Sequence, residues 1–212
     1  MGLKDTLSTH KDWFLYWNIG RALRGCESVL DLGCGECSPL LYVKKSFTSV
    51  GVDGYGPSIL KSKKLRIHDR YIYSNLLFIG DKIKPKSFDA VILLDVVEHF
   101  SKKDGLKILH IAETIAKKKI VVLTPNGFYR QDEIGGNPYQ VHKSGWSLGD
   151  LTTRGYIVRG LRGLKFIRGE YATIYRKPWI VWAVLAFVTE PLLYFWPSAS
   201  YHYFAVKRIF HE

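Results

Sequence analysis

The sequence predicts an α/β fold, in which a doubly wound, mostly parallel sheet carries helices on both faces. Three observations lead to this prediction. Short, nearly all-apolar runs recur along the chain, helical stretches separate them, and glycine or acidic residues stand where several runs end. Strands without polar alternation are typical of a parallel sheet that is buried on both faces. Right-handed crossovers between such strands place helices on both sides.

The individual elements follow in chain order. Apolar runs predict strands over residues 28–32, 49–52, 71–73, 90–94, 120–123, 156–158 and 203–206. Helices are expected around residues 38–46, 56–67 and 101–116. No linker rich in Pro, Gly or Ser divides the chain, so we expect one domain over residues 1–212.

Residues 1–25 are expected to contain an N-terminal helix. Trp13, Phe14, Trp17 and Leu23 recur near helical spacing and would give it one aromatic face. Such a helix either docks on the core or forms a lid over a ligand pocket, and the sequence does not separate the two. In the lid interpretation, Trp17 is a candidate substrate contact.

Charge and cysteine content set broad limits. The net charge is +12, from 31 Lys and Arg against 19 Asp and Glu. This suits nucleic acid, an anionic membrane surface or an anionic substrate without selecting among them. The cysteines are too few for a disulfide framework and no secretory leader is visible, so we expect a cytoplasmic protein. Cys34 and Cys37 have metal-pair spacing, but no second pair follows.

The main local motif follows the first expected strand. Gly33 and Gly35 let the backbone turn tightly and approach a ligand without an intervening Cβ. Asp53 follows the second strand, where a carboxylate can accept hydrogen bonds from both hydroxyls of a ribose. The structural alternative for Asp53 is a turn at Asp53-Gly54. Ligands of such sheets bind outside the carboxyl ends of the strands, so both features belong to one predicted site.

Residues 29–35, Asp53, residues 87–100 and residues 124–127 together carry a family resemblance. In this order they resemble the class I S-adenosylmethionine-dependent methyltransferases, in the small-molecule, quinone-pathway branch (methyltransferase type 11-like). The resemblance implies a Rossmann-like sheet of seven strands with an antiparallel last strand, and S-adenosylmethionine as cofactor with S-adenosylhomocysteine as product. The cofactor contacts that it implies are Asp31, Gly33, Cys34, Gly35, Asp53, Asn75, Leu76, Leu94 and Asp95.

Two positions depart from the family pattern. Asn75 stands where the family often has an Asp that binds the adenine amine, although its carbonyl oxygen can still accept a hydrogen bond. Cys37 stands where a third glycine is common, in the part of the loop that approaches the methionine moiety. Neither departure removes the ribose carboxylate of Asp53.

Methyl transfer from a sulfonium is an in-line displacement, so the enzyme aligns the acceptor and, for a hydroxyl or amine, removes a proton. His99, after the fourth strand, is the candidate base, with helix capping as the structural alternative. The loop 137–146 supplies Tyr139 and His142 as candidate substrate contacts, and His142 is also a candidate catalytic residue. For His142 the alternative is a cap for a helix near Ser147.

Asp95, Glu98 and His99 have the spacing that places three ligand-type groups on one helix face. Some quinone O-methyltransferases that are similar in this segment use a magnesium ion there. The same pattern also occurs in relatives without metal. The sequence therefore assigns no metal ligand, and whether a metal is used near these three residues stays open.

Residues 178–197 form an apolar insertion between the last two expected strands. The uninterrupted run is shorter than the roughly 20 residues that span a membrane, and Glu190 and Pro191 are expected to break it. Three interpretations stay open: a helix buried against the sheet, a dimer interface, or a helix resting in a bilayer surface. Peripheral membrane contact would suit the basic residues that flank the stretch, which are Arg176, Lys177, Lys207 and Arg208.

The sequence thus predicts methyl transfer to a small-molecule or lipid-like acceptor, on oxygen, nitrogen or carbon. An RNA methyltransferase is the alternative that the positive charge suggests, although no RNA-binding module is visible and the Asn/Asp-Pro-Pro-Tyr/Phe motif of many base methyltransferases is missing. A third possibility is a non-catalytic module that keeps the cofactor pocket. Whether the chain acts as a monomer or a homodimer stays open.

Overall fold

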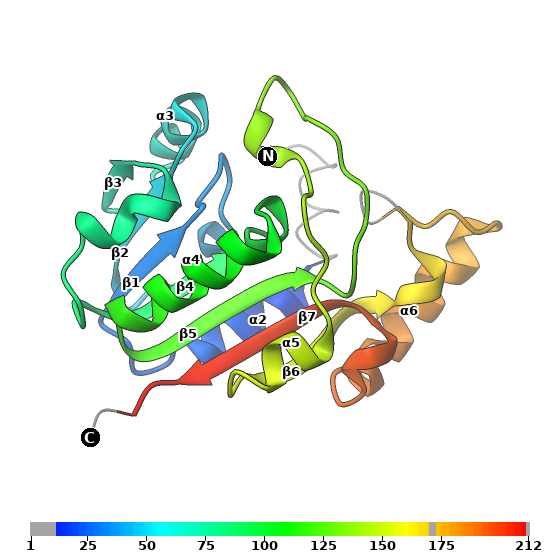
Figure 1. Cartoon of the computed structure of the whole chain (residues 1–212). Coiled ribbons are helices and arrows are strands. Elements are labelled where there is room, and N and C mark those ends of the chain that lie inside the picture. The colour runs from blue at the N-terminus through cyan, green and yellow to red at the C-terminus, as the bar shows by residue number, and fades with distance from the viewer. Residues whose placement is uncertain (1–11, 170–172, 211–212) are drawn as a thin grey trace.

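The computed structural model describes residues 12–169 and 173–210. Its seven-stranded sheet has the order β3-β2-β1-β4-β5-β7-β6 (Figure 1). Strands β1 to β5 pair in parallel, and β7 is antiparallel to both of its neighbours. This confirms the predicted fold class. The strands are β1 (Ser28–Leu32), β2 (Thr48–Asp53), β3 (Arg70–Tyr73), β4 (Phe88–Leu94), β5 (Ala116–Pro125), β6 (Ile157–Leu164) and β7 (Ser200–Arg208).

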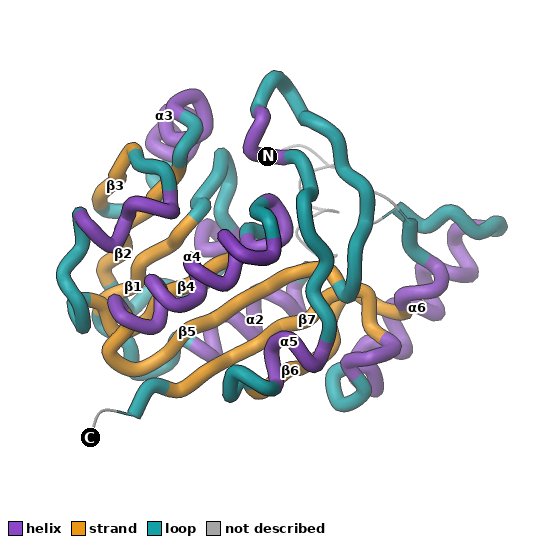
Figure 2. Tube along the Cα trace, in the orientation of Figure 1, coloured by secondary structure: helices purple, strands orange, loops and turns teal. Residues whose placement is uncertain are grey.

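Helices cover both faces of the sheet, and Figure 2 shows α4 in front of it and α2 behind it. Val91 and Ile92 are neighbours on β4, so their side chains point to opposite faces. Val91 shares a core with Ile108 of α4, and Ile92 shares the other core with Ile19 of α2. The helices are α2 (Trp13–Ala22), α3 (Gly56–Lys64), α4 (Lys102–Ile115), α5 (Leu148–Thr152) and α6 (Trp179–Leu193), and the 3₁₀ turns are η1 (Pro39–Tyr42), η2 (Leu76–Asp81), η3 (Val97–His99), η4 (Pro138–Gln140), η5 (Lys165–Ile167) and η7 (Pro197–Ala199).

One expected helix differs from the prediction, and another is described only in part. Of the helix expected within residues 1–25 the structure describes α2, and residues 1–11 lie outside the described residues. The segment 38–46 contains only the turn η1, which Ser38 caps by accepting a hydrogen bond from the Leu40 N–H. The turn ends because Val43 adopts an extended backbone and buries its side chain in the core that α2 covers.

Strand β6 is longer than expected, since residues 156–158 mark only its beginning. Its pairing with β7 shifts register between Leu161 and Leu164. Within this bulge Arg162 and Gly163 have positive φ angles of 61° and 74°. Glycines interrupt the apolar pattern of this strand, so a prediction based on apolar runs stops early.

The apolar insertion forms α6, which corrects two expectations. The helix continues through Pro191 to Leu193 instead of breaking there. Burial of the whole stretch in the core is wrong, because only Ala186 and Leu193 of α6 are buried. Within the described ranges, no helix combines the length and hydropathy that crossing a membrane requires.

Candidate functional site

A crevice runs along the carboxyl ends of β1, β2 and β4. It consists of three adjoining cavities of about 370, 60 and 310 Å³, and Asp95 and Gln140 line all three. We call them the glycine-loop cavity, the β2-end pocket and the histidine cavity. Their characteristic lining residues are Asp31, Gly33, Cys34 and Leu94 in the first, Asp53, Asn75, Leu76 and Tyr139 in the second, and Glu98, His99, His142 and His202 in the third.

The glycine loop after β1 has the conformation that its sequence predicts. Gly33 and Gly35 have φ angles of 75° and 57°, in the left-handed region that favours glycine. A Cβ on Gly33 would lie 2.6 Å from a methyl carbon of Val96. The Gly33 and Cys34 N–H groups both donate to the Val52 carbonyl, at 2.8 and 3.0 Å, which ties the loop to β2. The loop backbone therefore borders the cavity directly.

Asp53 closes this loop from the end of β2. Its Oδ2 accepts a hydrogen bond from the Gly35 N–H at 2.9 Å, and its Oδ1 accepts one from the Tyr55 N–H at 2.7 Å. Burial raises the pKa of the carboxyl, and the backbone donors oppose that rise. Each carboxylate oxygen keeps a further lone pair, so the pair can still accept hydrogen bonds from two vicinal hydroxyls.

Asp31 lines the glycine-loop cavity from the end of β1. It is 1% exposed, and the Ser38 hydroxyl donates to its Oδ2 at 2.6 Å. Burial raises the pKa of Asp31 to about 7. The nearby His68, whose Nε2 lies 3.4 Å from Oδ2, has its pKa lowered by burial to about 4 and supplies no positive charge. A cationic group of a ligand would therefore favour the ionised form of Asp31.

Cys34 and Leu94 complete the apolar part of the same cavity. Both are buried, and burial raises the pKa of the Cys34 thiol, so this thiol is not ionised at neutral pH. Cys37 is exposed, and neither cysteine is bonded to the other.

The β2-end pocket brings together Asp53, Asn75 and Leu76. The side-chain oxygen of Asn75, Oδ1, accepts a hydrogen bond from the Leu77 N–H at 3.0 Å and so caps η2. Tyr139 lies here as well, because its ring would be 3.5 Å from a Cβ placed on Gly54. The sequence predicts Tyr139 as a substrate contact, and the structure places it on the Asp53 side of the crevice.

Asp95 stands where the three cavities meet. Its φ of 55° is left-handed, and its carboxylate lies 3.2 Å from Nη1 of Arg162 and 3.1 Å from Nε2 of His202. Burial opposes ionisation, but the Arg162 guanidinium holds the pKa of Asp95 well below its usual range. Asp95 is thus turned toward β6 and β7. Contrary to what its spacing suggested, it does not share a helix face with Glu98 and His99.

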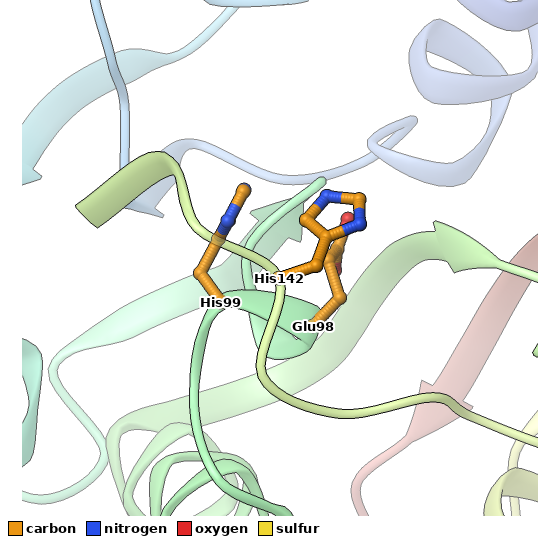
Figure 3. Close-up of side chains that lie close together, drawn as sticks. All are labelled: Glu98, His99 and His142. Atoms are coloured by element: carbon orange, nitrogen blue, oxygen red, sulfur yellow. The ribbon is translucent and has the colours of Figure 1, made fainter. Parts of the chain in front are cut away.

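The histidine cavity holds a different group of three, formed by Glu98, His99 and His142. Figure 3 shows Glu98 and His99 on the turn after β4 and His142 reaching over Glu98 from a separate loop. The Glu98 carbonyl accepts hydrogen bonds from the Lys143 and Ser144 N–H groups, which holds this loop beside η3. One ligand atom from each of the three side chains lies within 4.8 Å of the others, and the two imidazole centres are 4.9 Å apart.

These side chains fit a divalent cation. The Nδ1–H of His142 donates to the Tyr129 carbonyl at 2.7 Å and that of His99 to the Val141 carbonyl at 3.4 Å, which leaves both Nε2 lone pairs available. Burial lowers the pKa of both histidines, that of His99 to about 4, so both are neutral, as metal ligands must be. The buried Glu98 Oε1 has no hydrogen-bond partner in the described part of the chain.

Other residues are placed differently from the prediction or were not predicted at all. Trp17 does not line the crevice: it is half exposed and stacks on Phe14, with Arg21 over its ring. Its neighbour Tyr16 lines the glycine-loop cavity instead. The sequence does not predict Arg162 at this site; its one signal there is the pair of nearby glycines, Gly160 and Gly163, which suggests a strand bulge.

We compared the sequence and the structure with those of known proteins. No protein-family model matches the sequence, and no curated protein matches it. A solved S-adenosylmethionine-dependent methyltransferase from Archaeoglobus fulgidus superposes with a TM-score of 0.58 at 18% identity, over 96% of this chain and 99% of that one. The small RNA methyltransferase HEN1 gives a TM-score of 0.61 at 14% identity, over 97% of this chain and 25% of that one. Magnesium protoporphyrin IX methyltransferase (ChlM) from Synechocystis, solved with bound S-adenosylmethionine, gives 0.53 at 15%, over 96% and 82%.

The chain has the fold of the S-adenosylmethionine-dependent methyltransferases. The strand order and the antiparallel β7 agree with the expected fold. At 12–18% identity the likeness establishes the fold alone. It does not select the quinone-pathway branch, since the similar structures include methyltransferases for small molecules and for RNA.

Proposed function

We propose that this chain transfers the methyl group of S-adenosylmethionine to a hydroxyl group of a small-molecule or lipid-like acceptor. The observation that carries the proposal is the placement of Asp53 against the glycine loop, which borders both the β2-end pocket and the glycine-loop cavity at the carboxyl ends of the parallel strands. This is where open α/β sheets bind nucleotide-like ligands.

The three cavities suit the parts of the two substrates. Asp53 would accept hydrogen bonds from the ribose hydroxyls, with Asn75 and Leu76 beside the adenine. Asp31 would face the positively charged methionine end, where a cationic group favours its carboxylate form. The acceptor would then enter through the histidine cavity. Asp95 lines both this cavity and the glycine-loop cavity. Both reacting groups are thereby aligned, which is the main requirement of an in-line displacement.

A hydroxyl acceptor is favoured by Glu98, His99 and His142, which we propose hold a divalent cation. His99 with a pKa near 4 is a weak base, so a ligand role suits it better than the proton removal that the sequence suggested. A bound divalent cation would act as a Lewis acid and lower the pKa of a hydroxyl group near it. The three side chains would hold the cation in the histidine cavity, which shares Asp95 and Gln140 with the glycine-loop cavity.

The cation site can be tested without any transfer assay. Isothermal titration of the protein with Mn²⁺ alone should give one site per chain, and His142→Ala should weaken it at least about tenfold. His110→Ala is the matched control, because His110 is exposed on α4 and does not belong to the group of Glu98, His99 and His142. Equal Mn²⁺ affinity in wild type and His142→Ala would refute the cation site.

RNA is the second candidate acceptor, supported by the net charge of +12 and by the similarity to a small RNA methyltransferase. Transfer of a labelled methyl group to separated lipid, small-molecule and RNA fractions of a lysate would distinguish the acceptors. We expect label in the lipid or small-molecule fraction. Label in RNA alone would support the second candidate, and no label in any fraction, from protein that binds the cofactor, would support a non-catalytic module.

A further inference from the structure

The outer side of α6 is an apolar surface that nothing in the described chain covers. Its large side chains are mostly exposed: Phe187 to 60%, Val188 to 64% and Leu192 to 73%. Figure 1 shows α6 standing at the edge of the molecule, beyond β6. Contiguous exposed apolar surface of this kind marks an interaction site rather than ordinary surface.

The inner side of α6 is held firmly to β6, so the exposed side has a fixed orientation. A Cβ on Gly163 would lie 2.9 Å from Cβ of Ala186, which shows how closely the helix approaches the strand. The Glu190 carboxylate accepts a hydrogen bond from the Arg162 N–H at 2.9 Å. Ala186 and Leu193 are two helical turns apart and lie on this inner side, so the remaining circumference faces outward.

Tryptophan and basic side chains border the apolar side. At the start of α6, Arg176 lies 5.6 Å from the ring centre of Trp182 and 5.5 Å from that of Tyr175. At the other end, Trp196 is 67% exposed. Aromatic residues with basic neighbours at the ends of an apolar helix are typical of the water–lipid interface.

A cavity of about 350 Å³, which we call the basic cavity, adjoins the C-terminal end of α6. Tyr194, directly after the helix, lines it, and Arg159 lies 5.4 Å from the centre of the Tyr194 ring. The basic side chains in its wall are Arg21, Lys119, Arg159 and Arg208, and no acidic residue stands among the described residues that line it. The sequence suggested that Arg208 flanks the apolar stretch. In the structure Arg208 instead reaches this cavity from the far end of β7.

The same surface continues onto α2. Phe14 packs edge-on against Tyr194, and Trp13 and Trp17, each about half exposed, lie beside Phe14. Arg21 contacts both the Trp17 ring and the Tyr194 hydroxyl. This gives Trp17 a place in an aromatic and basic surface instead of in the crevice.

We propose that the outer side of α6, with the basic cavity beside it, docks on the surface of an anionic phospholipid bilayer. The apolar side chains enter the headgroup region, the tryptophans lie at its edge, and the arginines of the basic cavity meet anionic headgroups. Charge complementarity selects this occupant, since the charged side chains among the described residues that line the cavity are all basic and the chain carries a net charge of +12. The proposal stands independently of methyl transfer.

Flotation of the full chain with lipid vesicles tests it. Wild type should float with phosphatidylcholine vesicles that contain phosphatidylglycerol, and far less with phosphatidylcholine alone or at high salt. Phe187→Glu should weaken binding at least about tenfold, because it removes a large apolar side chain from the interface and adds a repelled charge. Phe78→Glu is the matched control: Phe78 is 57% exposed but lies on η2, and this variant should bind as wild type does.

A second variant tests the role of the basic cavity. Arg21→Gln combined with Arg159→Gln should weaken binding to the anionic vesicles, whereas Lys61→Gln with Lys64→Gln on α3 should not. Circular dichroism of each variant checks that it is folded. Wild type that fails to float, or Phe187→Glu that floats as well as wild type, would overturn the proposal. So would a wild-type dimer in light scattering that Phe187→Glu converts to a monomer, because a second copy would then cover α6.

Discussion

Two carboxylates at neighbouring strand ends differ in how they are held. Asp53 accepts hydrogen bonds from two backbone N–H groups, whereas Asp31 accepts one from the Ser38 hydroxyl and is more deeply buried. Donors stabilise a carboxylate and burial destabilises it. Burial therefore raises the pKa of Asp31 to about 7, so the ionisation of this residue changes near neutral pH.

Affinity for S-adenosylmethionine should depend on pH through Asp31. A cationic ligand group prefers the carboxylate, and that form is lost as the pH falls below about 7, so affinity should fall about tenfold or more between about pH 7.5 and about pH 5.5. Isothermal titration at several pH values measures this. Asp31→Asn should bind weakly and without this dependence, and Ser38→Ala should shift the midpoint upward because it removes a donor to the carboxylate. An unchanged pH profile in Asp31→Asn would contradict the role of Asp31.

Arg162 should contribute measurably to stability through Asp95. Arg162→Met removes the guanidinium from a largely buried carboxylate and should lower the free energy of unfolding by about 1–2 kcal/mol, less than for a fully buried pair because Asp95 is partly exposed. Urea denaturation gives the value. Arg130→Met is the control, since its ion pair with Asp132 is exposed on both sides and should contribute almost nothing. Equal stability losses in the two variants would contradict this account.

At the scale of elements, the glycine loop and the turn η1 replace the usual sequence of loop and helix after β1. The loop is fixed by hydrogen bonds to the Val52 carbonyl and by contact with Val96, both from neighbouring strand ends. The short turn leaves room for Tyr16 and Tyr42, whose rings stack at 4.8 Å and border the cavity. The shape of the loop therefore depends on tertiary contacts as much as on its glycines.

The two glycines of the loop should differ in their response to substitution. Gly33→Ala combines a left-handed φ with a 2.6 Å clash against Val96 and should lower the free energy of unfolding by about 2–4 kcal/mol. Gly35→Ala meets no atom within 4 Å, so only the backbone strain of about 1 kcal/mol remains. Urea denaturation of both variants compares them. A smaller loss for Gly33→Ala than for Gly35→Ala would show that the contact with Val96 is not as described.

At the scale of the whole molecule, the parts of the fold that follow from apolar runs could be predicted. β1 begins and ends where expected because its run is bounded by polar residues and glycines. β6 could be predicted only at its start, because Arg159 and Gly160 interrupt the apolar run directly after Val158. The segment 38–46 was misjudged because burial of Val43 depends on α2, which local sequence does not reveal.

The candidate site likewise contains residues that the local sequence predicts and residues whose position depends on tertiary contacts. Gly33, Gly35 and Asp53 could be found because each lies directly at a strand end. His99 and His142 were also candidates, but their grouping with Glu98 could not be predicted, because a long loop returns to η3 through hydrogen bonds to the Glu98 carbonyl. The crevice-facing position of Arg162 likewise depends on a bulge in a distant strand.

The central claim is that the crevice beside Asp53 binds S-adenosylmethionine. Isothermal titration should show one S-adenosylmethionine per chain for wild type. Asp53→Ala should bind at least about tenfold more weakly, because a charged acceptor of two hydrogen bonds is lost, and Asp81→Ala, at an exposed position on η2, should bind as wild type does. Wild type that does not bind, or a folded Asp53→Ala variant that binds equally well, would contradict the claim.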